Sequence, residues 1–151
     1  MIVPGLPEGY SARPLTRADL DAISLVHRRA CLTAYAFFGW NHSFEEVRDW
    51  YDDKFAAFDW SAMIHRGEEP AGYLAAIGSH LDQIFIDPGH QRRGIGAALI
   101  GAMIARGRPV TLHCFEENLP ARALYERLGF VVESRFIDAD SGHAEFVYRL
   151  D

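Results

Sequence analysis

The sequence has only two cysteines among its 151 residues, Cys31 and Cys114. They form neither a disulfide framework nor a Cys-x-x-Cys pair, so the sequence favours free thiols in a reducing compartment and a cytoplasmic protein. There is no run of about 18 apolar residues, which excludes a transmembrane helix and disfavours a membrane partner. The opening residues lack the basic start and apolar core of a signal peptide.

The sequence has no surplus of positive charge. It contains 15 Lys and Arg residues and 21 Asp and Glu residues, which gives a net charge of −6. Nucleic-acid-binding domains usually show a basic footprint, so we expect no nucleic-acid partner. The charge weakly favours a cationic substrate, since whole-chain charge says little about one cleft. The seven histidines show no metal-ligand spacing with cysteine or carboxylate partners, so we predict no metal.

What the chain does contain is typical of a globular domain. It is 49% hydrophobic and 24% charged, and its length suffices for one sizeable core. No repeat, linker or low-complexity tract divides it. Residues 1–151 are therefore predicted to form a single domain.

Hydrophobic periodicity and turn residues predict four helices and seven strands. The helices are expected from Thr16 to near Tyr35, after Ser43 with an aromatic stripe reaching Phe58, over Ile95–Ala105, and from Asn118 to Gly129. The strands are expected at Tyr10–Leu15, Trp60–His65, Gly72–Ile77, His80–Ile86, Val110–Phe115, Val131–Ile137 and Ala144–Leu150.

This element order, β-α-α-β-β-β-α-β-α-β-β, predicts an α/β fold with a mixed central sheet and helices on both faces. The three strands between residues 60 and 86 are joined by short turns and should form an antiparallel meander. The strands on either side of the third helix should be parallel. Diverging parallel strands leave a crevice at their carboxyl ends, where ligands of α/β proteins usually bind.

A glycine loop lies between a predicted strand and a predicted helix, at Gln91-Arg92-Arg93-Gly94-Ile95-Gly96-Ala97. This arrangement binds phosphate, because glycines let backbone N–H groups converge and the helix dipole adds positive charge. Leu99 stands where a dinucleotide fingerprint has its third glycine, and no Walker ending follows. A tight surface turn with two solvated arginines is the alternative that the loop alone leaves open.

A second motif, Asn118-Leu-Pro-Ala-Arg-Ala-Leu-Tyr125-Glu-Arg-Leu-Gly-Phe130, follows the loop after one strand. Together the two motifs resemble the pyrophosphate loop and second cofactor segment of the GNAT superfamily of acetyl-CoA-dependent N-acetyltransferases. The resemblance covers essentially the whole predicted element order. It implies a transferase that moves an acetyl group directly from acetyl-CoA, as cosubstrate, to a primary amine of a small molecule, amino acid or peptide. It leaves a homodimer open.

The resemblance also implies positions for the cosubstrate. Its pyrophosphate would lie on the loop, against Gln91, Arg92, Arg93, Gly94, Ile95, Gly96 and Ala97. The pantetheine arm would pair with the strand residues Ile84, Phe85 and Ile86. Asn118 would contact the pantetheine region, and the Tyr125 hydroxyl would meet the thioester sulfur. A simple turn cap for Asn118 and a core position for Tyr125 are the alternatives.

The reaction needs a neutral amine, and a lysine-like amine with a pKa of about 10.4 is neutral in roughly one molecule in 2,500 at pH 7. A base would assist its deprotonation. His80 and Asp82 stand two residues apart, so an undistorted strand would place both on one face, at positions where some members of the superfamily carry catalytic groups. We hypothesise that one of them relays the amine proton. A solvent-facing pair is the alternative, and a strand bulge could change which of them points inward.

The connection between the first two helices carries Tyr35, Phe38, Trp40 and His42, in a region that often lines the acceptor site in this superfamily. Aromatic rings there could hold an apolar or cationic acceptor. Core packing or a dimer surface is the alternative. Cys114 lies in an apolar strand, which disfavours a covalent route. A non-catalytic acyl-CoA-binding domain and a nucleotide-phosphate-binding protein are the rival functions.

Overall fold

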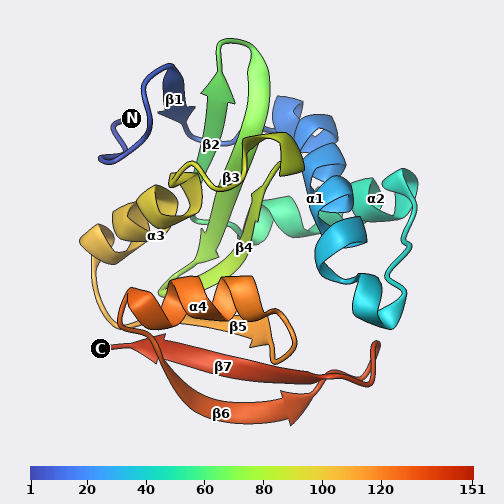
Figure 1. The fold of residues 1–151 in the computed structure, drawn as a ribbon. Helices are drawn as coiled ribbons and strands as arrows, with labels where there is room; N and C mark the ends of the chain where they lie inside the picture. The colour runs from blue at the N-terminus through green and yellow to red at the C-terminus, as the bar shows by residue number, and fades with distance from the viewer.

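A seven-stranded mixed sheet runs through the computed structural model, which describes residues 1–151 (Figure 1). The strand order is β1-β2-β3-β4-β5-β7-β6. The strands are β1 (Tyr10–Arg13), β2 (Trp60–Arg66), β3 (Glu69–Ile77), β4 (His80–Ile86), β5 (Val110–Phe115), β6 (Val131–Ile137) and β7 (Ala144–Leu150). The helices are α1 (Leu20–Ala34), α2 (Phe44–Lys54), α3 (Ile95–Arg106) and α4 (Leu119–Arg127). The predicted element order and fold class are confirmed.

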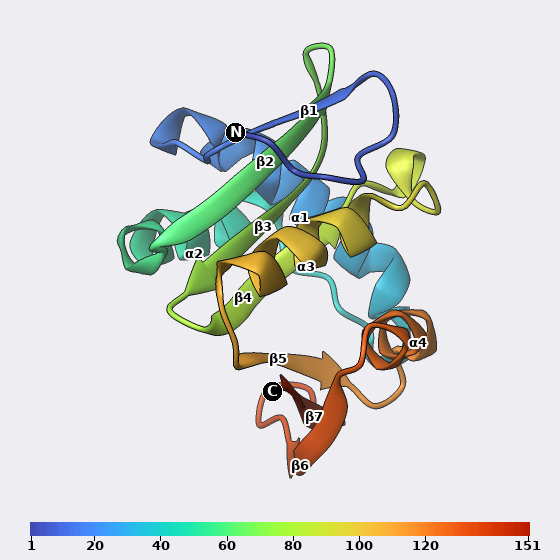
Figure 2. The ribbon, with the colours of Figure 1, turned by 90° about the vertical axis from the view of Figure 1, so that its left-hand side faces the viewer.

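Helices cover both faces of the sheet, and Figure 2 shows α3 in front of β2–β4 with α1 and α2 behind them. A core cluster of 17 buried residues joins one face to α3 and α4, with Leu99, Ile100 and Tyr148 among its fully buried members. A second cluster of 9 buried residues joins the other face to α1 and α2 around Tyr51 and Tyr73. None of the helices combines the length and the apolar character that a membrane span requires.

The strands β4 and β5 are parallel, as predicted, but they pair only at their beginnings. His80 lies opposite Thr111 and Leu81 lies opposite Leu112, and no later pair follows. In Figure 1, β5, β6 and β7 run across the lower end of β2, β3 and β4. From Asp82 onward β4 therefore has β3 on one side and no strand on the other. This opening is the crevice that the topology predicts.

A β-bulge interrupts β4 at the residue proposed as a base. Ala75 pairs with Gln83 and Ala76 pairs with Leu81, so Asp82 is the additional residue on the β4 side. The premise of an undistorted strand is therefore wrong. Residue spacing alone does not decide which way Asp82 points, because a bulge changes the alternation of side chains.

Several element ends differ from their predicted positions. Strand β1 stops at Arg13 because Pro14 has no N–H group to donate to the ladder. Helix α2 ends at Lys54, and Phe55–Ala57 forms a short 3-10 helix. The aromatic stripe is also not wholly core, since Trp50 is 40% exposed.

The predicted helix caps have mixed outcomes. Ser43 caps α2 as expected, because its hydroxyl accepts from the Glu46 N–H at 3.1 Å and its own N–H donates to Glu46 at 3.2 Å. Thr16 instead precedes a short 3-10 helix, Arg17–Asp19, and α1 begins directly after that helix, at Leu20. The capping-box pattern thus marks the beginning of the helical segment in both cases, but only Ser43 caps the α-helix itself.

Helix α4 ends in the predicted left-handed glycine. Gly129 has a φ of 98°, and the Phe130 N–H donates to the Tyr125 carbonyl at 3.1 Å. Phe130 is 2% exposed and packs in the larger core cluster. This Schellman-type ending fixes the C-terminal turn of α4, which carries Tyr125.

Gly72 on β3 is required by the close approach of β4. A Cβ atom there would lie 2.7 Å from Cδ1 of Ile86 and 2.9 Å from the carbonyl oxygen of Phe85. We expect Gly72→Ala to lower the free energy of unfolding by about 1–3 kcal/mol, because the β4 backbone must move away. Chemical denaturation checks this, with Gly101→Ala in α3 as the control, since a Cβ there meets nothing within 4 Å. Equal stability of the two variants would contradict the expectation.

Candidate active site

The glycine loop between β4 and α3 holds two residues in the left-handed region. Arg92 has a φ of 64° and Gly94 has a φ of 84°. Glycine tolerates this conformation, whereas a residue with a Cβ is rarely found there. Non-glycine residues in this region cluster at binding sites and turns, so Arg92 marks the loop as a candidate site. Arg92 and Arg93 are both exposed.

The loop leaves a row of backbone N–H groups free. None of the N–H groups from Gln91 to Ala97 donates to an acceptor within the protein, and the first that does is Ala98, to the Gly94 carbonyl at 3.0 Å. Free N–H groups at the beginning of a helix, together with left-handed residues, form a concave site for an anion.

Buried polar contacts support the segment before this loop. His90 is 4% exposed; its Nδ1 lies 2.8 Å from the Tyr10 hydroxyl and its Nε2 lies 3.0 Å from Glu69. Asp87 accepts from the Gly89 N–H at 2.9 Å. The Gln91 side chain donates to the Ile86 carbonyl at 3.0 Å and so ties the loop to the end of β4.

A cavity of about 720 Å³, which we call the loop cavity, extends from this loop between β4 and α4. It is lined by Ile84, Phe85 and Ile86, by most of the loop, and by Asn118 and Tyr125. Arg93 does not line it. Asn118 also caps α4, where its side-chain oxygen accepts from the Ala121 N–H at 3.4 Å. The cap and a ligand contact are therefore compatible.

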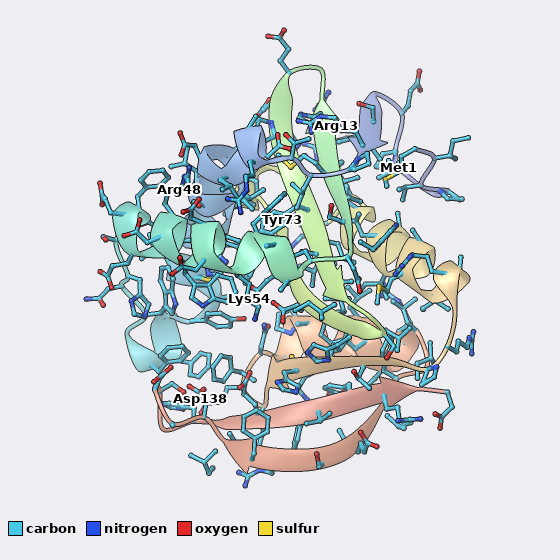
Figure 3. The ribbon with its side chains drawn as sticks, turned by 180° about the vertical axis from the view of Figure 1, so that it is seen from behind. Met1, Arg13, Arg48, Lys54, Tyr73 and Asp138 are labelled. Carbon is cyan, nitrogen blue, oxygen red and sulfur yellow. The ribbon has the colours of Figure 1, made fainter.

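A second cavity, of about 480 Å³, lies over β4 on the α1 and α2 side of the sheet, and we call it the strand cavity. The two cavities meet, because they share five lining residues: Tyr35, Ile84, Phe85, His113 and Tyr125. Figure 3 looks at this side, with Lys54 at the end of α2 and Asp138 at the end of the β6–β7 hairpin. Both residues line the strand cavity.

Tyr125 lies where the two cavities meet. It is 7% exposed and lines both cavities, and its hydroxyl makes no side-chain hydrogen bond within the protein. Burial raises the pKa of this phenol far above its ordinary value, with smaller contributions from Cys114 and Tyr148. The hydroxyl is therefore protonated across the physiological pH range and can act as a hydrogen-bond donor.

His80 and Asp82 both line the strand cavity despite the bulge. Nδ1 of His80 lies 2.8 Å from the Thr111 hydroxyl, and burial is the main cause that lowers the pKa of its imidazole. His80 is therefore mainly neutral at pH 7. Asp82 lies 3.3 Å from the Lys54 ammonium and forms an ion pair with it.

Of the four residues proposed from the connection between α1 and α2, only Tyr35 lines a cavity, and it lines both. Phe38 stacks on Tyr35, with ring centroids 5.6 Å apart, and so supports it from behind. Trp40 packs against His27 with centroids 5.9 Å apart. His42 is exposed and lies 3.0 Å from Glu46.

Several cavity residues were not anticipated from the sequence, among them His27, His113 and Glu145. Nδ1 of His27 lies 2.8 Å from the Tyr51 hydroxyl, and burial lowers the pKa of this imidazole to about 4. His113 lines both cavities, and its ring centroid is 4.9 Å from that of His80. Glu145 lines the strand cavity from β7.

Sequence periodicity offers a signal for only one of these three residues. Thr111, His113 and Phe115 alternate along β5, so a period-two pattern places His113 on the face of Thr111. His27 and Glu145 reach the cavity only through tertiary packing.

Cys114 is 5% exposed, and burial raises the pKa of its thiol to about 12. A thiol with this pKa holds almost no thiolate at pH 7 and is a poor nucleophile. No group of three or more His, Cys, Asp or Glu side chains is arranged to hold a metal ion. The absence of a metal requirement remains a prediction.

Residues 27–130 match the family model described as the acetyltransferase (GNAT) family. The match covers more than half of the chain, from within α1 to the end of α4, and the chain belongs to this family. The peptidyl-lysine N-acetyltransferase YjaB of Salmonella typhimurium is 33% identical over 76 residues, which cover 50% of this chain and 52% of YjaB. The chain thus spans about half the length of the curated relatives it matches.

Solved structures show the same fold. Apo-form YjaB from Escherichia coli superposes with a TM-score of 0.72 at 20% identity, covering 93% of this chain and 96% of that one. The structure of yncA from Salmonella typhimurium with its cofactor acetyl-CoA has a TM-score of 0.70 at 16% identity, covering 95% and 94% of the two chains. At these identities the likeness extends to the fold alone.

Proposed function

We propose that the protein transfers an acetyl group from acetyl-CoA to a primary amine by direct transfer. The observation that carries this function is the row of free N–H groups from Gln91 to Ala97, which shares one cavity with the buried side chain of Tyr125. Anion recognition at one end and a hydrogen-bond donor at the other suit a diphosphate ligand with a distant reactive thioester. The name of the relative YjaB supports an amine acceptor.

The residues of the loop cavity fit acetyl-CoA as cosubstrate, which supplies an activated acetyl thioester when bound. The free N–H groups of the loop hold the pyrophosphate, with the Arg92 and Arg93 guanidiniums available nearby. The unpaired edge of β4, from Ile84 to Ile86, can accept the amides of the pantetheine arm as an added strand would. Asn118 contacts the same arm from the N-terminus of α4.

Tyr125 acts on the leaving sulfur as a hydrogen-bond donor. A phenol pKa of about 10 against a thiol pKa of about 8.5 makes full proton transfer to thiolate uphill by about 2 kcal/mol. The raised pKa of the buried Tyr125 makes this transfer still less favourable. A positioned donor that stabilises developing negative charge on sulfur avoids this cost. The high thiol pKa of Cys114 supports transfer without a covalent enzyme intermediate.

The acceptor amine enters the strand cavity, where His80 or Asp82 takes its proton directly or through water. Tyr35 lines the junction of the two cavities and contacts the acceptor, with Phe38 packed on its ring. Trp40 and His42 line neither cavity, so neither is assigned a contact with the acceptor. The buried free thiols of Cys31 and Cys114 fit a protein of the reducing cytoplasm.

Alanine variants test the two candidate bases. We expect the His80→Ala, Asp82→Ala double variant to lose about 100-fold in kcat/KM at pH 7. Because the pKa of His80 lies below its ordinary value, wild-type activity carried by His80 should fall only below about pH 6.5. The pH–rate profiles of the single and double variants measure this, with His42→Ala as a control outside both cavities. An unchanged profile in the double variant removes both residues as bases.

An amine panel tests the activity as a whole. Thiol release from acetyl-CoA, with mass-spectrometric detection of the acetylated product, is expected with at least one primary amine. Binding of acetyl-CoA without turnover of any amine would instead favour an acyl-CoA-binding domain. Thermal stabilisation by nucleotides but not by coenzyme A would contradict the proposal at its first step.

A further inference from the structure

Negative charge exceeds positive charge in the strand cavity. Its lining contains three carboxylates, Asp82, Asp138 and Glu145, against one lysine, Lys54. The Lys54 ammonium is already paired with Asp82 at 3.3 Å. The imidazoles of His27 and His80 have lowered pKa values and add little positive charge at pH 7. Two carboxylates are left with no cation of the protein beside them.

These two carboxylates come from the β6–β7 hairpin. Asp138 follows β6, and its carboxylate accepts one hydrogen bond, from the Ser141 N–H at 2.9 Å. Glu145 belongs to β7 and has neither a hydrogen bond nor an ion pair through its carboxylate, although it is partly buried. A partly buried carboxylate without a partner is unfavourable for folding, which suggests that a ligand supplies the partner.

Aromatic rings lie beside the same pair. Phe115 is the register partner of Glu145 across β5 and β7, and its ring centroid is 5.0 Å from that of Tyr35. Both rings line the strand cavity. Aromatic faces beside carboxylates attract an organic cation more strongly than either group alone.

Tyr125, which is 7% exposed, also lines this cavity. Tyr125 marks the end of the cavity where the thioester is expected. The same cavity therefore contains both the expected site of reaction and the carboxylates of the β6–β7 hairpin. The amine that is acetylated must first become neutral, so it cannot be the cation that the hairpin carboxylates bind. A second, protonated amine of the same acceptor could be that cation.

We propose that Asp138 and Glu145 bind a second positive charge of the acceptor, so that the preferred substrates are alkylamines carrying another ammonium group. This inference rests on the proposed acetyltransferase function and names its substrate class. The second ammonium lies against the hairpin carboxylates and the rings of Tyr35 and Phe115. The reacting amine then extends toward Tyr125.

The pH dependence of binding should follow Glu145. Burial and then the nearby Asp138 raise the pKa of Glu145 to about 7. Among the nearby titratable groups, Tyr35, Tyr125 and Cys114 have pKa values raised by burial and are neutral at pH 7, and His113 lines the same cavity. Only the ionised carboxylate attracts a cation, so KM for a doubly charged amine should fall as pH rises from 6 to 8.

Matched amines and variants test the inference. Wild-type kcat/KM is expected to be about 10-fold higher for diaminobutane than for butylamine, because a charge-assisted hydrogen bond is gained. Glu145→Gln and Asp138→Asn should remove this preference by raising KM for diaminobutane much more than KM for butylamine. Glu145→Gln should also remove the fall in KM between pH 6 and pH 8. Glu133→Gln on β6 is the control, because Glu133 lines neither cavity.

Equal efficiency with the two amines in the wild type would overturn the second-charge site and leave the transferase function standing. An equal loss for both amines in Glu145→Gln would also overturn it, because Glu145 would then act on the reacting amine. Calorimetric titration of the coenzyme A-saturated protein with diaminobutane separates the two ideas. Binding that depends on Glu145 without turnover of any amine would keep the site and reject the transferase function.

Discussion

Replacing Tyr125 with Phe is expected to lower kcat about 100-fold and to leave the affinity for acetyl-CoA nearly unchanged. The ring of Tyr125 packs against Phe130 and Tyr148 and remains in the variant, so the cavity keeps its shape. Only the hydroxyl is lost, and it makes no side-chain hydrogen bond within the protein whose partner would be left unsatisfied. Because the sulfur gains negative charge chiefly in the transition state, the loss should appear in kcat.

Steady-state kinetics with an accepted amine and calorimetric titration with acetyl-CoA check this expectation. Tyr148→Phe is the matched control, since it also removes a buried tyrosine hydroxyl. That hydroxyl accepts from Arg122 at 3.0 Å and lies 3.1 Å from Glu126, and Tyr148 lines neither cavity. Tyr148→Phe should lower the Tm with little effect on kcat. Full activity in Tyr125→Phe would remove the donor role.

Replacing Gly94 with Val should weaken acetyl-CoA binding by at least about 10-fold. Gly94 has a φ of 84°, and a residue with a Cβ in this conformation costs about 1–2 kcal/mol, more when it is β-branched. The loop would relax toward negative φ and turn its free N–H groups away from one another. The change should therefore appear in the Kd for coenzyme A more than in the Tm.

Two further glycines serve as comparisons for Gly94. A Cβ at Gly96 would lie 3.6 Å from Cδ2 of Leu124, which is an ordinary contact, so Gly96→Ala should bind coenzyme A nearly as well as the wild type. Gly101→Ala lies farther along α3 and meets nothing within 4 Å. Calorimetric Kd values for the three variants measure the difference. Equal values for Gly94→Val and Gly96→Ala would show that the left-handed turn is not what binds the diphosphate.

The sequence was sufficient to predict the fold because its local signals agree. Short turns force the meander between β2 and β4, and a helix of about three turns between β4 and β5 forces a parallel pair. Ser43 and Gly129 mark the ends of α2 and α4 with the residues that such ends need. Errors are confined to element ends and to the bulge at Asp82. A bulge arises from pairing between strands, which single-strand periodicity does not contain.

The site was only partly predictable for a related reason. The loop and Tyr125 belong to contiguous motifs, so their chemistry can be read from adjacent residues. Glu145 faces the cavity because of its register with Phe115, and His27 does so because α1 packs across β4. Phe38 and Trp40 fall behind the residues that line the cavity, since a connection rich in aromatic residues does not reveal which ring points inward. Long-range contacts decide each of these cases.

The two cavities share only a small set of lining residues and otherwise draw on separate parts of the chain. The loop cavity depends on the segment from Gln91 to Ala97 and on α4, whereas the strand cavity depends on the end of α2 and the β6–β7 hairpin. Under the proposed function, substitutions in the hairpin would therefore change which amine is accepted without changing the residues that hold the acetyl donor.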